Sequence, residues 1–408
     1  MDITNLRENY PKLISHLNNA HYNKAYVSKF NSEIKHILRL AASDKLSCYA
    51  DVYREYERAG SSKHKLREKR SVIGQIEQFD LFGQYPDGTR KQTLLPRGAY
   101  YLLCPEYKAI IDDYISAAAN SGKKDSTINS ESEKTAVFLL KLQQSGVVDL
   151  ADANEGNVLA VFVAPDGRPT RRTYRNAIAT VLMTSVSAYP NCEKVVAFLP
   201  VFRKNRNNIQ YLTDEEIAKT KKSLTGDITS LKLRDKAIGM LVLYTGLRRC
   251  DIASMTLDAI DWEKDTLNIR QQKTEMPLTL PLSAIVGNAL YDYIKMERPE
   301  SECNYVFLSQ NRPFGRMKSG SMAQVAAKIM KAADIRQDFG DRQGFHIFRH
   351  HLATKLLGNG VSRPVISSLI GHASPESLDT YLSADFPHLK ECAMSVERFP
   401  MAQEVLEI

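Results

Sequence analysis

The chain has 408 residues, of which 43% are hydrophobic and 25% charged, a composition typical of globular proteins. The formal net charge of +8 favours a polyanionic partner, nucleic acid above all, and the length predicts two or three domains. The six cysteines are scattered without a CxxC or Cys–His pattern, which argues against a zinc module or a disulfide framework. We find neither a secretory pattern at the N-terminus nor a run of about 20 apolar residues, so we expect a soluble protein of a reducing compartment.

The first part of the chain, residues 1–104, predicts additional helices. Stretches such as VSKFNSEIKHILRLAA place apolar residues at helical spacing. The basic run KHKLREKR, Lys63 to Arg70, fits a solvated helix face or a phosphate-binding surface equally well. The turn formers of QYPDGTRKQTLLPRG, from Gln84, predict a boundary.

A second helical unit is expected over residues 105–202. Its helices are EYKAIIDDYISAAA, EKTAVFLLKLQQSG with Gly146 as C-cap, and TRRTYRNAIATVLMTSVSAY. The last helix begins with several arginines, which its dipole opposes, so their position favours contact with a phosphate backbone. The basic, polar stretch 203–208 predicts a linker. Together these segments supply the candidate phosphate-contact residues, which are Arg171, Arg172, Arg175, Arg203, Lys204 and Arg206.

A third unit is expected over residues 209–385. Thr213 and Glu216 form a capping box before an apolar-periodic helix. Residues 267–282, LNIRQQKTEMPLTLPL, predict a strand, a turn and a strand, and the rest is helical. We therefore expect a mainly α fold with a small antiparallel β-sheet (α+β). The partly apolar tail 386–408 is a candidate for packing on a neighbouring protomer.

Four short motifs in this third unit carry candidate chemistry. In LVLYTGLRRCDIASMTL we expect a helix to end at Gly246, with Arg248 and Arg249 directly after it. The next helix is expected to begin near Asp251. The carboxylate of Asp251 lies one turn after Arg248 and can orient that arginine. The hairpin has a lysine near its tip. The other two motifs are GFHIFRHHLATKLLGNG and LIGHASPESLDTYLSAD.

The last two motifs add the histidines and a tyrosine. His346 and Arg349 lie three residues apart, so both project from one helix face and suit an anionic group. His350 and His351 lie on other faces and are expected to be structural. In the fourth motif the turn at Gly371 and His372 is expected to bring Tyr381 back to the same pocket.

The four motifs and their order resemble the tyrosine recombinase (phage integrase) family. Along the chain they are TGLRRCD, a hairpin lysine, HIFRH and IGHASPESLDTY. The resemblance covers residues 209–385, and residues 105–202 look like the family's helical core-binding domain. The positions that match the family's catalytic residues are Arg248, Lys273, His346, Arg349, His372 and Tyr381, with Asp251 at a supporting acidic position. This chain departs from the family's usual pattern at Arg249, whose role is left open, at KTEMP in the hairpin, and at Ile370.

The resemblance implies a site-specific DNA recombinase, an integrase or transposase of a mobile element. Tyr381 is expected to attack a DNA phosphodiester and form a 3′-phosphotyrosine, with no cofactor and no metal ion. The expected partner is double-stranded DNA, held between two basic lobes. The chain is expected to form a homotetramer in the synaptic complex, and accessory DNA-bending proteins are further candidate partners. Residues 1–104 become a candidate DNA-binding segment, and the expected location is the cytoplasm, at the nucleoid.

Three other functions share features with this one. A resolvase of replicon dimers uses the same chemistry. A DNA-binding regulator that has lost the reaction is disfavoured by the intact residue set. A type IB topoisomerase acts alone on one strand, and the order of motifs from Arg248 to Tyr381 fits the recombinases better.

Overall fold

The computed structural model describes residues 2–43, 46–87, 94, 98–163, 172–202, 210–226, 230–312, 314–338, 341–371 and 378. The chain divides into two compact units. Unit 1 comprises residues 1–4, 36–83 and 91–206, and unit 2 comprises residues 5–35, 84–90 and 207–408. The domain limits expected from the sequence stay a prediction.

Amphipathic helices form the N-terminal part of the chain, as predicted. They are α1 (Thr4–Asn19), α2 (Lys24–Ala41), α3 (Tyr49–Arg58) and α4 (Lys63–Phe82). On α1 the buried residues recur at helical spacing, at Leu6, Leu13 and Leu17. The basic run lies in the first turns of α4, where Lys63, Lys65 and Arg67 are exposed to solvent.

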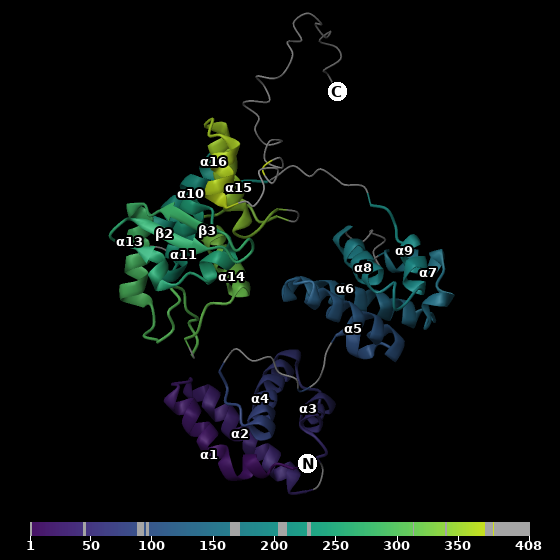
Figure 1. Ribbon diagram of the computed structural model, residues 1–408. Coiled ribbons are helices and arrows are strands. Elements are labelled where there is room, and N and C mark those ends of the chain that lie inside the picture. The colour runs from purple at the N-terminus through teal and green to yellow at the C-terminus, as the bar shows by residue number, and fades with distance from the viewer. Residues whose placement is uncertain are drawn as a thin grey trace, which may run out of the picture. The chain divides into compact units, whose positions relative to one another are not determined.

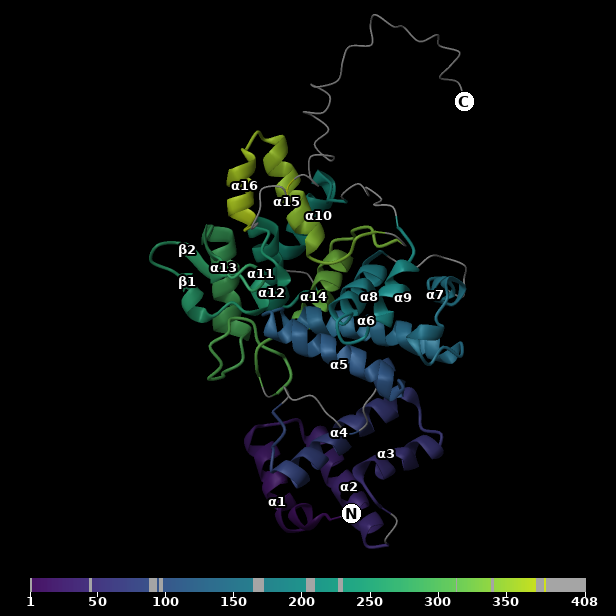
Figure 2. The same cartoon turned by 45° about the vertical axis from the view of Figure 1, so that its right-hand side comes forward.

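The part of unit 1 after residue 91 is also helical and confirms the helices expected there. Its elements are η1 (Ala99–Leu102), α5 (Pro105–Asn120), α6 (Asp125–Gln144), η2 (Leu150–Asp152), α7 (Glu155–Val161), α8 (Arg172–Thr184) and α9 (Asn191–Ala197). Helices α5, α6 and α8 pack on one another around apolar side chains such as Phe138 and Ile178, and Figure 2 shows them together. Gly146 follows α6 with φ +93°, in keeping with its expected capping position.

Unit 2 contains the predicted hairpin and most of the remaining helices. Its helices after residue 209 are α10 (Asp214–Thr225), α11 (Leu233–Thr245), α12 (Arg249–Ala253), η3 (Leu257–Ala259), α13 (Ala284–Asp292), the π-helical turn η4 (Tyr293–Glu297), α14 (Ser319–Ala332), α15 (His346–Gly358) and α16 (Arg363–Ile370). The predicted capping box begins α10, where Thr213 Oγ1 accepts from Glu216 N–H at 3.2 Å and a Glu216 carboxylate oxygen accepts from Thr213 N–H at 2.9 Å.

Helix α11 lies at the centre of unit 2. It contacts α10, α13, α14 and α15, and Figure 1 shows it among them. Its sequence is apolar on every side, and residues from Ala237 to Leu243 are buried without a break. A helix that is apolar all round belongs inside a core. This buried helix ends at the turn that carries Arg248, so the turn is attached directly to the core of the unit.

A three-stranded antiparallel sheet covers one side of this core. Its strands are β1 (Ile260–Asp261), β2 (Thr266–Arg270) and β3 (Pro277–Pro281), in the order β1-β2-β3. Leu267 pairs with Leu280 and Ile269 with Leu278, and these four side chains face inward while their neighbours face solvent. The predicted strand, turn and strand are confirmed, and with them the mainly α fold with a small antiparallel sheet.

The last described helices, α15 and α16, lie side by side in both Figure 1 and Figure 2. Ala353, Leu357, Ile366 and Ile370 form a small apolar cluster between them. Within the described ranges, no helix is long and apolar enough to cross a membrane.

Candidate active site

The turn after α11 positions Arg248. Gly246 ends that helix with φ +61°, a left-handed conformation that glycine adopts without strain. A Cβ at this position would lie 2.9 Å from Leu352 Cδ2 on α15, so the turn also needs the missing side chain for close packing. Arg248 follows as the N-cap of α12, which begins at Arg249 and not near Asp251 as expected.

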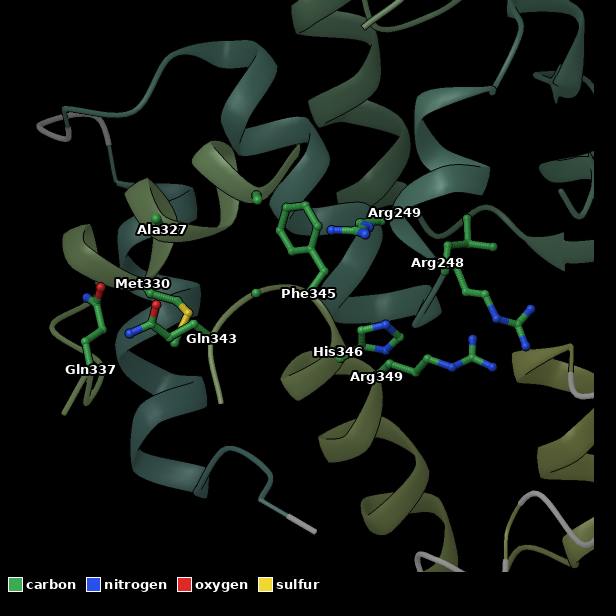
Figure 3. Close-up of a pocket in the computed structure, with 12 residues that line it drawn as sticks. Arg248, Arg249, Ala327, Met330, Gln337, Gln343, Phe345, His346 and Arg349 are labelled. Atoms are coloured by element: carbon green, nitrogen blue, oxygen red, sulfur yellow. The ribbon is translucent and has the colours of Figure 1, made fainter. Parts of the chain in front are cut away.

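The second arginine is anchored on the same turn. Arg349 lies in the first turns of α15, is only 3% exposed, and donates from Nη1 to the main-chain oxygen of Gly246 at 2.8 Å. Arg248 Nη2 donates to the main-chain oxygen of Gly371 at 3.0 Å. Both guanidinium groups are therefore positioned by carbonyl groups of other segments. Figure 3 shows their ends approaching each other, with the ring of His346 beside the stem of Arg349.

One pocket is shared by these residues. Arg248, Arg249, His346 and Arg349 line it, and the other lining residues are Leu247, Ala323, Ala327, Met330, Gln337, Gln343, Gly344 and Phe345. The predicted i, i+3 pair thus faces one pocket, as the spacing indicated. Figure 3 shows Arg249 pointing away from the other two arginines, toward the ring of Phe345.

The electrostatics of the pocket suit an anion. Burial and then the positive charges of Arg349, Arg249, Arg342 and Arg248 lower the pKa of His346 below its ordinary value. With a pKa below the ordinary value of about 6.5, His346 is mainly neutral at pH 7, and its exposed ring is accessible as a proton acceptor. Neither Arg248 nor Arg249 forms an ion pair with any carboxylate in the part of the chain that the structure describes. A cationic group without an acidic partner favours a bound phosphate.

Asp251 contacts the hairpin. It is fully buried, and its Oδ1 accepts a hydrogen bond from the main-chain N–H of Gln272 at 2.8 Å, while no arginine among the described residues donates to it. Its Oδ2 has no hydrogen-bond partner among the described residues. The carboxylate therefore holds the base of the β2–β3 hairpin to α12. Sequence spacing placed it near Arg248, but the contact with residue 272 depends on tertiary packing.

Lys273 lies in the hairpin turn, as predicted, and is exposed. The turn is closed by a hydrogen bond from Gln271 N–H to the Met276 oxygen at 3.0 Å and another from Glu275 N–H to the Gln271 oxygen at 2.8 Å. In the KTEMP sequence Glu275 takes φ +60°, a conformation that glycine adopts more readily.

Sequence reasoning missed Gln271, which contacts the site from the hairpin. Its side chain is 1% exposed and approaches both Arg248 and Gly371. A signal was present in the alternation: Leu267 and Ile269 face inward, so residue 271 is the next inward position, and a polar residue there is unusual.

The two histidines after Arg349 bind the start of the third predicted domain. His350 Nδ1 lies 3.1 Å from the Gln210 oxygen, and His351 Nδ1 lies 2.7 Å from the Leu212 oxygen. Burial lowers the pKa of His350 to about 4. Both residues hold residues 210–212 against α15.

Several predicted site residues lie outside the described residues, and these are His372, Tyr381, Arg171, Arg203, Lys204 and Arg206. The tail 386–408 lies outside them as well. Of the candidate phosphate contacts, Arg172 is exposed and Arg175 half-buried, both on α8 of unit 1.

Comparisons with known proteins identify the family of the chain. The model of the phage integrase family matches residues 210–388. The integrase/recombinase y4gC of Sinorhizobium fredii (strain NBRC 101917 / NGR234) is 31% identical over 185 residues, which are 45% of this chain and 94% of that protein. Tyrosine recombinase XerA of Pyrococcus furiosus is 27% identical over 199 residues, 48% of this chain and 63% of that protein.

A solved structure shares the fold. The crystal structure of the XerH site-specific recombinase bound to difH substrate matches with a TM-score of 0.50 and 18% identity, over 66% of this chain and 79% of that one. The sequence match to an integrase/recombinase over 94% of that protein identifies the class of this chain as a recombinase of the integrase type. The chain belongs to the phage integrase family of tyrosine recombinases, enzymes that cut and rejoin DNA strands.

Proposed function

We propose that this chain is the site-specific recombinase of a mobile element and that it cuts duplex DNA through Tyr381. The observation that carries the proposal is the pair Arg248 and Arg349, anchored on main-chain carbonyls of separate segments beside a neutral His346. The integrase description of the Sinorhizobium relative supports a mobile element, and the DNA substrate of XerH supports duplex DNA as partner.

In the proposed reaction the phenolic oxygen of Tyr381 attacks the scissile phosphorus. His346 accepts the phenol proton, because a phenol with a pKa near 10 needs a base at neutral pH. Arg248 and Arg349 bind the non-bridging oxygens, where negative charge develops, and His372 donates a further hydrogen bond. Each such donor contributes about 3 to 4 kcal/mol of transition-state stabilisation.

The leaving group is the 5′ oxygen of the cut strand. Lys273 delivers a proton to it as the bond to phosphorus breaks, and the hairpin that carries the lysine is held at its base by Asp251. The 3′ end of the cut strand stays joined to Tyr381 as a phosphodiester. The 5′ hydroxyl of a second strand reverses the attack and restores the DNA, so the energy of the broken bond is conserved.

Phosphate binding outside the catalytic pocket is assigned to residues of unit 1. Arg172 and Arg175 on α8 contact phosphates, together with Arg171, Arg203, Lys204 and Arg206, and these contacts make affinity fall steeply with salt. Strand exchange joins two sites, so the active assembly is a tetramer on DNA in the cytoplasm. Accessory DNA-bending proteins are candidate partners of that assembly.

A covalent selection tests the proposal without knowledge of the target. The full chain is incubated with a pool of randomised duplexes, denatured, and the DNA that stays attached is amplified. A nicked duplex of the selected sequence then traps the intermediate, because the cut fragment diffuses away. Wild type is expected to give the adduct and Tyr381→Phe none. Adducts from both proteins, or from neither, refute the proposal.

A further inference from the structure

Gln271 is a polar residue at an inward-facing position. It follows β2 directly and continues the buried series of Leu267 and Ile269, with a side chain that is 1% exposed. Burying a carboxamide is unfavourable unless its N–H and C=O groups find partners. The neighbouring segments must therefore supply those partners.

The partners come from two further segments and from the hairpin itself. With the amide nitrogen directed at Gly371, Nε2 donates to the Gly371 oxygen at 3.0 Å and to Thr274 Oγ1 at 2.6 Å, and Oε1 accepts from Arg248 Nη1 at 3.2 Å. Arg248 Nη2 donates to the same Gly371 oxygen at 3.0 Å. Arg248, Gln271 and Gly371 thus form a closed ring of hydrogen bonds.

Gly371 is shaped for this contact. A Cβ at this position would overlap the Gln271 carboxamide, and the residue has φ +66°, which side chains rarely allow. The glycine therefore does two things at once. It ends α16 in the left-handed conformation, and it leaves room for the carboxamide to reach the carbonyl group that also holds Arg248.

The ring fixes the plane of the Arg248 guanidinium. A guanidinium group has five N–H donors in one plane. One donor on Nη1 binds Gln271 and one on Nη2 binds Gly371, so both ends of the fork are held. Within the described ranges the remaining donors, including Nε–H, have no hydrogen-bond partner, so they can bind a phosphate. One bond alone would leave the group free to rotate about it.

We propose that Gln271 is a positioning residue for DNA cleavage, which orients Arg248 and connects it to the hairpin that carries Lys273 and to Gly371 at the end of α16. This inference rests on the proposed function, and Gln271 itself does not touch DNA. Its carboxamide connects three parts of the site that are far apart in the chain. Any loss of that connection displaces Arg248 without removing a donor.

The test measures single-turnover cleavage of the nicked duplex and, separately, DNA binding by fluorescence anisotropy. Gln271→Met keeps the length of the side chain and removes its hydrogen bonds. We expect cleavage to slow by about 10- to 100-fold, because small misplacements of a catalytic group are costly, while binding changes by less than about twofold. The matched control is Asn268→Ala, which removes an exposed carboxamide from β2. The oxygen of this carboxamide accepts a hydrogen bond from the Thr279 hydroxyl. It should cleave like wild type.

A double variant separates positioning from general structural damage. In an Arg248→Ala background, Gln271→Met should cost less than about threefold, because the group that it orients is already absent. A full additional loss in that background overturns the inference. So does wild-type cleavage by Gln271→Met. If wild type itself forms no adduct, the proposed function fails instead, so the two failures are distinct.

A second variant keeps the inference testable if Gln271→Met does not fold. Thr274→Val removes one partner of the carboxamide at a half-buried position and leaves the chain otherwise unchanged. We expect cleavage to fall by about threefold or more with binding intact, since the carboxamide is then held less firmly. Unchanged cleavage by this variant counts against the role of Gln271.

Discussion

Replacing Gly371 by alanine should destabilise unit 2 markedly. The residue has φ +66°, and an L side chain in the left-handed region costs about 1 to 2 kcal/mol. The new Cβ also displaces the Gln271 carboxamide, which breaks its bonds with Gly371 and Arg248. Each such bond is worth about 0.5 to 1.5 kcal/mol net. The sum is roughly 2 to 5 kcal/mol.

Tryptophan fluorescence reports this change in the right unit. The chain has a single tryptophan, Trp262, which lies in unit 2 between β1 and β2. With a mid-range urea dependence of about 2 kcal/mol per molar, the loss should lower the unfolding midpoint by roughly 1 to 2.5 M.

The matched control is Gly320→Ala. Gly320 is an exposed residue of α14, has no positive φ, and has open space where a Cβ would lie. Alanine has the higher helix propensity, so this variant should unfold at the wild-type midpoint or above it. If Gly371→Ala has the same urea unfolding midpoint as Gly320→Ala, the close approach of Gln271 to residue 371 is wrong.

Three further predictions concern the charged groups. Arg349→Ala should slow cleavage by about 10²- to 10³-fold with nearly unchanged DNA affinity in anisotropy titrations; an equal loss in both would make Arg349 a docking residue. Because the pKa of His346 lies below its ordinary value of about 6.5, cleavage at subsaturating DNA should fall to half of its plateau only below pH 6.5, and a rate already halved at pH 7 would contradict the neutral base. The pKa of His350 is about 4 in the folded chain against about 6.5 unfolded, so the unfolded state binds more protons between these values. The contribution of His350 to the free energy of unfolding is intact above pH 6.5, and this free energy should fall by about 3 kcal/mol as pH decreases to 4. In urea unfolding, His350→Gln should flatten the dependence of this free energy on pH. An unchanged pH dependence would contradict the buried, neutral state of His350.

Local patterns were sufficient for much of the site. The capping box of Thr213 and Glu216 and the glycine at position 246 are signals within one turn of chain, and both confirm the predicted helix ends. The i, i+3 spacing of His346 and Arg349 places both on one pocket because helical geometry alone determines it.

The contacts that complete the site were not predictable in this way. Arg248 and Gly371 are joined by a hydrogen bond across 123 residues, and Asp251 binds the main chain 21 residues away. Such pairs depend on how helices pack on the sheet, and a single sequence does not record that. For Gln271 the alternation along β2 identified an odd residue, but its partners became known only from the structure.

The most direct test of the account is to identify the atom that becomes joined to DNA. The trapped adduct is digested with trypsin and a nuclease, and the modified peptide is sequenced by mass spectrometry. The account predicts one nucleotide-bearing peptide, with the 3′ phosphate on the side-chain oxygen of Tyr381. A phosphate attached to any other residue, or DNA cut without any attachment, would contradict it.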